Sequence, residues 1–132
     1  AASFIQAFGK IGLIPDAGGT FLLAHRLGLA RATALAMTGD KLSAAQAKEW
    51  GVVWDVADDC VAAADALAQR LAAMPTQALV RTRHLLRDAM TSSFEAQLQA
   101  ERDAQSALAK THDYFEGVTA FLEKRAPSFK GA

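Results

Sequence analysis

Apolar positions recur at helical spacing along most of the chain, and this pattern predicts a mainly helical protein. Windows in which apolar residues return every three or four positions are typical of amphipathic helices. In the second half of the chain such windows cover residues 60–74, 77–89, 94–109 and 111–125. Their apolar faces, which include Leu86 and Phe94, are expected to be buried. Several faces are wider than one neighbour covers, so we also expect apolar surface to remain for a partner.

The first half of the chain mixes predicted strands with shorter helices. Residues 2–11 are apolar and predict a strand, and residues 52–56, VVWDV, predict a second short strand because β-branched and aromatic residues favour strands. Helices are predicted at residues 16–27, where Gly28 ends the pattern, and at residues 30–37. Capping boxes are predicted where serine precedes an acid or amide by three residues, at Ser43 with Gln46 and at Ser92 with Glu95.

A turn rich in glycine joins the first predicted strand to the first predicted helix. Residues 12–20 are GLIPDAGGT, and glycine lets a backbone come close to a ligand because it has no side chain. The start of a helix also directs N–H groups and the positive end of the helix dipole outward. This stretch therefore predicts a functional site.

Asp16, the single acid of this turn, has two interpretations. It could be the N-cap of the following helix, which residue type alone favours. It could instead carry a proton near neutral pH, if the apolar Leu13, Ile14 and Phe21 remove water from its carboxyl group. The two interpretations are compatible with each other.

Composition narrows the classes of function. Hydrophobic residues make up 52% of the 132 residues, enough to form a core. Fourteen basic residues balance fourteen acidic ones, so charge gives no argument for nucleic acid or an anionic membrane as a partner. The three histidines are scattered, which gives no metal-ligand spacing. With one cysteine, Cys60, and no visible secretion signal, we expect a cytoplasmic protein.

The first residues already have a strand pattern, and no initiator methionine precedes them. An isolated strand cannot satisfy its backbone or bury both of its faces. We therefore expect the chain to be the C-terminal half of a longer protein.

Four runs of sequence resemble the crotonase (enoyl-CoA hydratase/isomerase) superfamily, in collinear order over nearly the whole chain. They are FGKIGLIPDAGGT at residues 8–20, LAMTGDKLSA at 35–44, AKEWGVVW at 47–54 and EGVTAFLEKR at 116–125. The resemblance implies the C-terminal half of the α/β crotonase (ClpP/crotonase-like) spiral fold, with this segment mostly α and one or two short strands. Residues 1–56 would end the ββα spiral core. Residues 57–132 would form a helical region that mediates oligomerisation and contacts CoA.

The resemblance also implies an activity. Isomerases of this superfamily carry an aspartate directly at the turn, which Asp16 matches, and Pro15 and Gly18 would lie beside the substrate. The acid that hydratases carry seven residues before the proline is replaced by Phe8. We therefore expect an acyl-CoA isomerase that moves a double bond or opens a ring epoxide through a thioester enolate. One donor to the enolate would come from the N-terminal half, so the isolated chain is expected to be inactive.

Two alternatives stay open at this point, an enoyl-CoA hydratase and a non-catalytic helical assembly module. The first would keep the fold but add water to its substrate, and its second catalytic acid would lie outside this chain. The second alternative is compatible with the composition, and binding of an acyl-CoA would separate it from both enzymes.

Phe121 and Lys124 are the candidate CoA-binding residues near the end of the chain. Their spacing of three residues puts them on one helical face, although spacing alone favours a core phenylalanine with a solvated lysine. In the superfamily these two positions contact CoA, often that of a neighbouring subunit. The resemblance thus implies an acyl-CoA thioester as partner, with no cofactor apart from the coenzyme A of the substrate. It also implies self-association into a trimer or hexamer, and no metal, nucleic acid or membrane.

Overall fold

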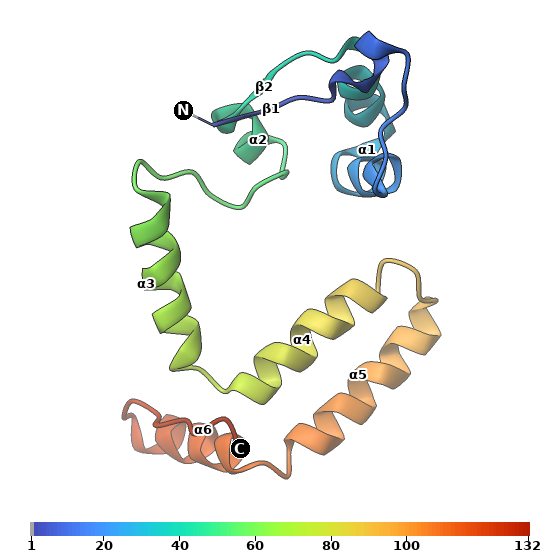
Figure 1. The fold of residues 1–132 in the computed structure, drawn as a ribbon. Helices are drawn as coiled ribbons and strands as arrows, with labels where there is room; N and C mark the ends of the chain where they lie inside the picture. The colour runs from blue at the N-terminus through green and yellow to red at the C-terminus, as the bar shows by residue number, and fades with distance from the viewer. Residues whose placement is uncertain (1) are drawn as a thin grey trace. The chain divides into compact units, whose positions relative to one another are not determined.

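The computed structural model describes residues 2–132, which divide into two compact units with the boundary between Cys60 and Val61. Figure 1 shows the elements of each unit along the chain. Helices dominate both units, and the only strands within residues 2–132 are two short ones in the first unit. The roles that we expect for residues 1–56 and 57–132 stay predictions.

The first unit combines a minimal sheet with three helical elements. In chain order these are β1 (Ser3–Phe4), the 3₁₀ helix η1 (Ala7–Ile11), α1 (Gly19–Thr38), β2 (Leu42–Ser43) and α2 (Ala44–Glu49). β1 and β2 pair antiparallel, with Ser3 opposite Ser43 and Phe4 opposite Leu42. The capping box predicted at Ser43 and Gln46 is confirmed at the start of α2.

Both strands predicted from the sequence need correction. The strand over residues 2–11 holds only for Ser3–Phe4, because its partner strand is two residues long and η1 begins soon afterwards. The strand over residues 52–56 is wrong. The N–H groups of Val52 and Val53 both donate to the carbonyl of Ala47, at 2.8 and 3.3 Å, so they close the end of α2 rather than join a sheet.

The core of the first unit gathers around α1, on both sides of Gly28. Gly28 has φ 73° and ψ 161°, values outside the helical region, so the predicted interruption at this residue is confirmed although one helix label spans it. On either side of it Leu27 and Leu35 pack with Leu42 and Ala47, and the partly buried Leu23, Trp50, Val52 and Val53 cover them.

The second unit consists of helices, at the positions that their periodicity predicts. They are α3 (Cys60–Ala72), α4 (Thr76–Asp88), α5 (Phe94–Leu108) and α6 (His112–Glu123). Figure 1 shows α4 and α5 running side by side in opposite directions. The capping serine of α5 is Ser93, which accepts the Ala96 N–H, and not Ser92 as predicted. Ser92 instead donates to the Asp88 carbonyl at 2.8 Å and extends the end of α4.

Much of the apolar surface of the second unit is uncovered. No described residue of α3, α4 or α5 is buried, and Leu86 and Phe94 are largely exposed, against the prediction that they lie inside. α4 packs against α5 along one side only, which leaves the side chains of Leu86 and Phe94 uncovered among residues 2–132. No helix of the described residues is long and apolar enough to span a membrane.

Candidate functional site

The turn before α1 has a well-defined backbone conformation. The Gly19 N–H donates to the Asp16 carbonyl at 2.7 Å, and the two residues between them both have positive φ, 48° at Ala17 and 79° at Gly18. Positive φ at both central positions is the pattern of a type I′ turn. Glycine suits the second position, whereas the left-handed conformation costs about 1–2 kcal/mol at Ala17.

Asp16 does not cap α1, so the N-cap interpretation is wrong. Gly18 is the N-cap residue, and its carbonyl accepts the Leu22 N–H at 2.9 Å. The Asp16 side chain lies two positions earlier, and the intervening turn is closed by backbone groups alone. Its carboxyl group is exposed and forms no hydrogen bond or ion pair with residues 2–132, which leaves it available to another molecule.

The surroundings of Asp16 are apolar but open. Leu13, Ile14 and Phe21 are all exposed, and Ile14 retains 79% of its accessible surface. The dry environment expected for the carboxyl group is therefore not formed by residues 2–132. Such an open apolar border favours burial against something else, because exposed apolar patches of this kind mark contact sites.

The glycines of the turn create room on one side and allow a close approach on the other. A Cβ at Gly19 would stand 3.3 Å from the Cβ of Pro15, so glycine lets the proline close against the start of α1. A Cβ at Gly18 would meet no atom within 4 Å, so among the described residues this side of the turn faces open space. Pro15, Asp16 and Gly18, three of the five predicted site residues, thus border one open turn.

The other two predicted site residues lie together at the end of α6, in the second unit. Lys124 follows the last helical residue and is left-handed, with φ 54° and ψ 40°. Its N–H donates to the Phe121 carbonyl at 3.3 Å, and the Arg125 N–H donates to the Ala120 carbonyl at 3.0 Å. These two bonds form a Schellman motif, which usually has glycine at the left-handed position.

The structure changes two expectations for Phe121 and Lys124. Lys124 lies outside the helix, so helical spacing from Phe121 does not set the direction of its side chain. Phe121 is 82% exposed, so the alternative of a core phenylalanine is wrong within residues 2–132. An exposed aromatic ring beside a helix end that carries a lysine is suited to contact a flat, anionic ligand.

An ion-pair network, which the sequence does not predict, is centred on Arg125, the residue after Lys124. The Arg125 guanidinium donates to both carboxylate oxygens of Glu116, at 2.7 and 2.9 Å, and its Nε donates to Glu123 at 2.6 Å. Glu116 also accepts the Ser128 N–H at 2.7 Å. Glu116 and Arg125 are nine residues apart, a separation with no helical or strand period, so no sequence signal pairs them.

These contacts, together with those of Asp113, shift the pKa values of Glu116, Arg125 and Asp113. Hydrogen bonds from Arg125 and then from the Ser128 N–H lower the pKa of Glu116 to about 2, and the bonds to Glu116 and Glu123 raise the pKa of Arg125. At the other end of α6, the buried Asp113 accepts the N–H groups of Lys130 and Gly131, at 2.7 and 2.8 Å. The bond from Lys130 leads the contacts that lower its pKa. Both carboxylates thus tie the C-terminal residues to α6.

We expect Glu116 to make the stability of the folded protein depend on acid pH. Its pKa in the folded state is about 2, below the ordinary value of about 4.3, so its contribution is complete above pH 4.3 and is lost as pH falls through 2. Thermal unfolding followed by circular dichroism between pH 2 and pH 6 should show a smaller loss of Tm on acidification in Glu116→Gln than in the unchanged protein. The control is Glu49→Gln, at the exposed end of α2. Equal slopes for Glu116→Gln and the unchanged protein would contradict the expectation.

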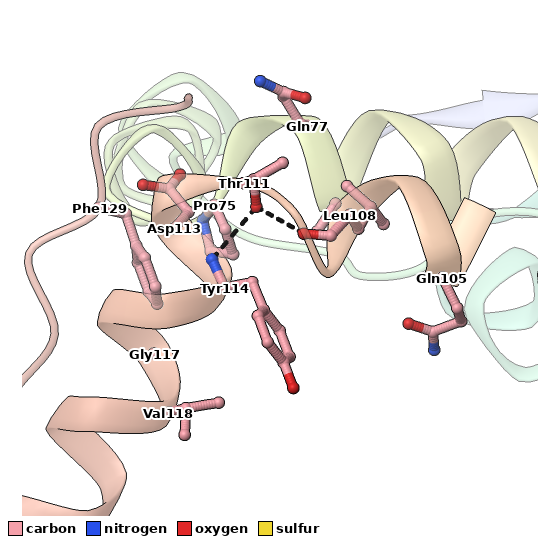
Figure 2. A pocket seen from close by; sticks show the side chains of 11 residues that line it. Pro75, Gln77, Gln105, Leu108, Thr111, Asp113, Tyr114, Gly117, Val118 and Phe129 are labelled. Atoms are coloured by element: carbon pink, nitrogen blue, oxygen red, sulfur yellow. Dashed lines mark hydrogen bonds between the residues drawn. The ribbon is translucent and has the colours of Figure 1, made fainter. Parts of the chain in front are cut away.

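A separate pocket of about 300 Å³ lies within the second unit, between α4, the end of α5, α6 and the C-terminal residues. Figure 2 shows the Thr111 hydroxyl at its wall, donating to the Leu108 carbonyl at 2.7 Å and accepting the Tyr114 N–H at 3.2 Å. Its lining is mainly apolar and includes Pro75, Ala78, Leu108, Tyr114, Val118 and Phe129. None of the five predicted site residues lines this pocket.

The comparisons of this chain with known proteins indicate one family. Residues 1–132 match the sequence profile described as enoyl-CoA hydratase/isomerase. The chain is 48% identical to the 1,2-epoxyphenylacetyl-CoA isomerase of Escherichia coli K12, over 99% of this chain and 51% of that protein. It is 38% identical to the trans-2-decenoyl-[acyl-carrier-protein] isomerase of Streptococcus mutans, over 97% of this chain and 49% of that protein.

Solved structures give the same result for the fold. The chain superposes on the enoyl-CoA hydratase subunit I of Geobacillus kaustophilus HTA426 with a TM-score of 0.96 and 34% identity, covering 100% of this chain and 52% of that one. The chain thus spans about half the length of the relatives that it matches.

Proposed function

Because the chain belongs to the enoyl-CoA hydratase/isomerase family and has the fold of the C-terminal half of a crotonase, we propose that it is part of an acyl-CoA isomerase. The reaction would move a double bond or open a ring epoxide through a thioester enolate. The specific substrate that we propose is 2-(1,2-epoxy-1,2-dihydrophenyl)acetyl-CoA, an intermediate of phenylacetate catabolism. The 48% identity to an isomerase named for 1,2-epoxyphenylacetyl-CoA supports this choice.

The observation that carries the proposal is the free carboxyl group of Asp16. It stands in an open turn beside Gly18, has no partner within residues 2–132, and is bordered by exposed apolar side chains. If the other half of the fold and the substrate cover those side chains, the carboxyl group becomes desolvated. A desolvated carboxyl group holds a proton more readily and suits transfer near neutral pH.

Isomerisation needs a group that removes a proton from one carbon and returns it to another. A single carboxylate can do both, provided that it reaches both carbons within one bound state. The negative charge that develops on the thioester oxygen needs backbone N–H donors, and we propose that one of them lies outside this chain. This division of the site is the reason to expect no turnover from residues 1–132 alone.

Hydration of an enoyl-CoA is the second candidate activity, because several relatives at 36–38% identity carry hydratase names. Phe8 stands where the resemblance places a hydratase acid, and its side chain cannot transfer a proton. An assay of product mass separates the two activities. Isomerisation leaves the mass of the thioester unchanged, whereas hydration adds the mass of one water.

We expect the full-length protein to convert the ring-epoxide thioester to a product of equal mass in a mass-spectrometric assay. The same assay with a 2-enoyl-CoA tests the hydratase alternative, and gain of one water at a comparable rate would replace the proposed activity. No conversion of either thioester, together with no binding of acyl-CoA, would favour a non-catalytic assembly module instead.

Two partners complete the proposal. The acyl-CoA would contact Phe121 and Lys124 through its nucleotide, and coenzyme A enters only as part of the substrate. A second copy of the protein would cover exposed apolar surface such as that of Leu86 and Phe94, giving a trimer or hexamer.

A further inference from the structure

The end of α6 holds a lysine where most helices of this ending have glycine. Lys124 adopts the left-handed conformation, and Ala17 is the only other non-glycine residue with positive φ within residues 2–132. Strained residues of this kind persist where the surrounding structure determines them, and they concentrate at functional sites. Two questions follow for Lys124: which contacts hold it in the left-handed conformation, and what function that conformation serves.

The cause is visible in the contacts of the next residue. Arg125 is fixed at its backbone by the bond from its N–H to the Ala120 carbonyl, and at its side chain by Glu116 and Glu123. Glu116 is itself held on α6, and only 15% of its side chain is exposed. With residue 125 held at its backbone and its side chain, the chain passes from α6 to Arg125 through a left-handed residue 124.

A simpler role for Lys124 would be to complement the helix dipole, which favours cations at the C-terminus. Arg125 already supplies a cation at this end of α6, and its charge is engaged by two carboxylates. Lys124 forms no ion pair with residues 2–132, so its ammonium group is available to another anion. The helix dipole favours a cation near the end of α6, but it does not explain why a lysine occupies the residue with positive φ there.

We propose that Arg125 and Glu116 are positioning residues, which hold Lys124 left-handed so that its ammonium group meets a phosphate of the acyl-CoA. This inference rests on the proposed function, because it takes the CoA thioester as the ligand of Lys124. Arg125 itself does not contact the ligand, since Glu116 and Glu123 occupy its guanidinium group. The network acts through the backbone at residue 124.

The test measures affinity for butyryl-CoA, a saturated thioester that cannot isomerise, by calorimetry on the full-length protein. Lys124→Ala is expected to weaken binding about tenfold or more, the usual effect of losing a charge-assisted contact. Glu116→Gln is expected to weaken it about threefold to tenfold, and the double variant should bind no more weakly than Lys124→Ala alone. Asp103→Asn, which removes an exposed carboxylate on α5, is the control and should leave affinity unchanged.

Two further variants separate positioning from folding. Lys124→Gly removes the backbone strain, so it should keep or raise Tm while losing as much affinity as Lys124→Ala. Arg125→Lys keeps a charge but loses the planar fork that holds Glu116, so it should also weaken binding about threefold to tenfold. It replaces Glu116→Gln as the test of positioning if Glu116→Gln does not fold.

The outcomes distinguish the inference from the function on which it rests. Unchanged affinity in Lys124→Ala would overturn both the CoA contact and the positioning role. A loss in Lys124→Ala with full affinity in Glu116→Gln and Arg125→Lys, or losses that multiply in the double variant, would overturn positioning alone. Full affinity in Lys124→Gly would show that only the shape of the helix end matters, and would also overturn it.

Discussion

Replacing Asp16 with asparagine is expected to lower turnover in the full-length protein by about two to four orders of magnitude, the usual contribution of a positioned acid–base group. The fold should be retained, because the Asp16 side chain makes no hydrogen bond within residues 2–132 and the turn is closed by the Gly19 N–H and the Asp16 carbonyl. Asparagine also tolerates turns well. The measurement is the isomerisation rate of the ring-epoxide thioester, together with Tm.

Two controls make this result specific. Asp58→Asn removes another exposed carboxylate of the first unit, outside the turn, and should leave the rate unchanged. Asp16→Glu keeps the acid but moves it, and a displacement of about 1 Å can cost about a hundredfold in rate. Near-normal turnover in Asp16→Asn, with Tm also unchanged, would remove Asp16 from the proposed mechanism.

Removing the ammonium group of Lys124 is expected to have the second largest effect. Lys124→Ala should weaken binding of a CoA thioester by about 1.4 kcal/mol or more, which is about tenfold, because a charge-assisted hydrogen bond to phosphate is lost. The rate at saturating substrate should change far less, because we assign this contact to uniform binding, which is equally strong with the substrate and with the transition state. Steady-state kinetics would show this as a raised KM with a nearly constant kcat.

Lys124→Arg is the matched comparison for this prediction. It keeps the charge at the same left-handed position and should recover part of the affinity. Lys110→Ala, which removes another lysine of the second unit after the end of α5, should leave KM unchanged. If Lys124→Ala lowers kcat and leaves KM as it was, Lys124 acts on the chemical step and the assignment to CoA binding is wrong.

The structure also separates two kinds of acid in this protein. Asp113 and Glu116 accept backbone N–H groups or pair with Arg125, and their lowered pKa values follow from those bonds. Asp16 has no such partner within the described residues. Asp113 and Glu116 are thus engaged within the chain, whereas the carboxyl group of Asp16 is left open, and its place in the glycine turn is what separates it from other exposed acids such as Asp58.

The sequence by itself determined the features that depend on neighbouring residues. Helix positions followed from apolar periodicity, the interruption of α1 from Gly28, and the start of α2 from Ser43 and Gln46, because each involves contacts within about one helical turn. The turn at Asp16 and Gly18 was recognisable for the same reason. Its composition alone limits the backbone conformations that are open to it.

Only the tertiary structure decided the features that join distant residues. Ser3 pairs with Ser43 in the sheet. Val52 and Val53 have a higher strand propensity than serine, yet their N–H groups donate to the Ala47 carbonyl at the end of α2. Glu116 meets Arg125 because the chain reverses after α6, and that reversal places Lys124 in a conformation which its residue type disfavours. Propensity is a local preference of a few tenths to about 1 kcal/mol, and contacts that the fold imposes from a distance readily exceed it.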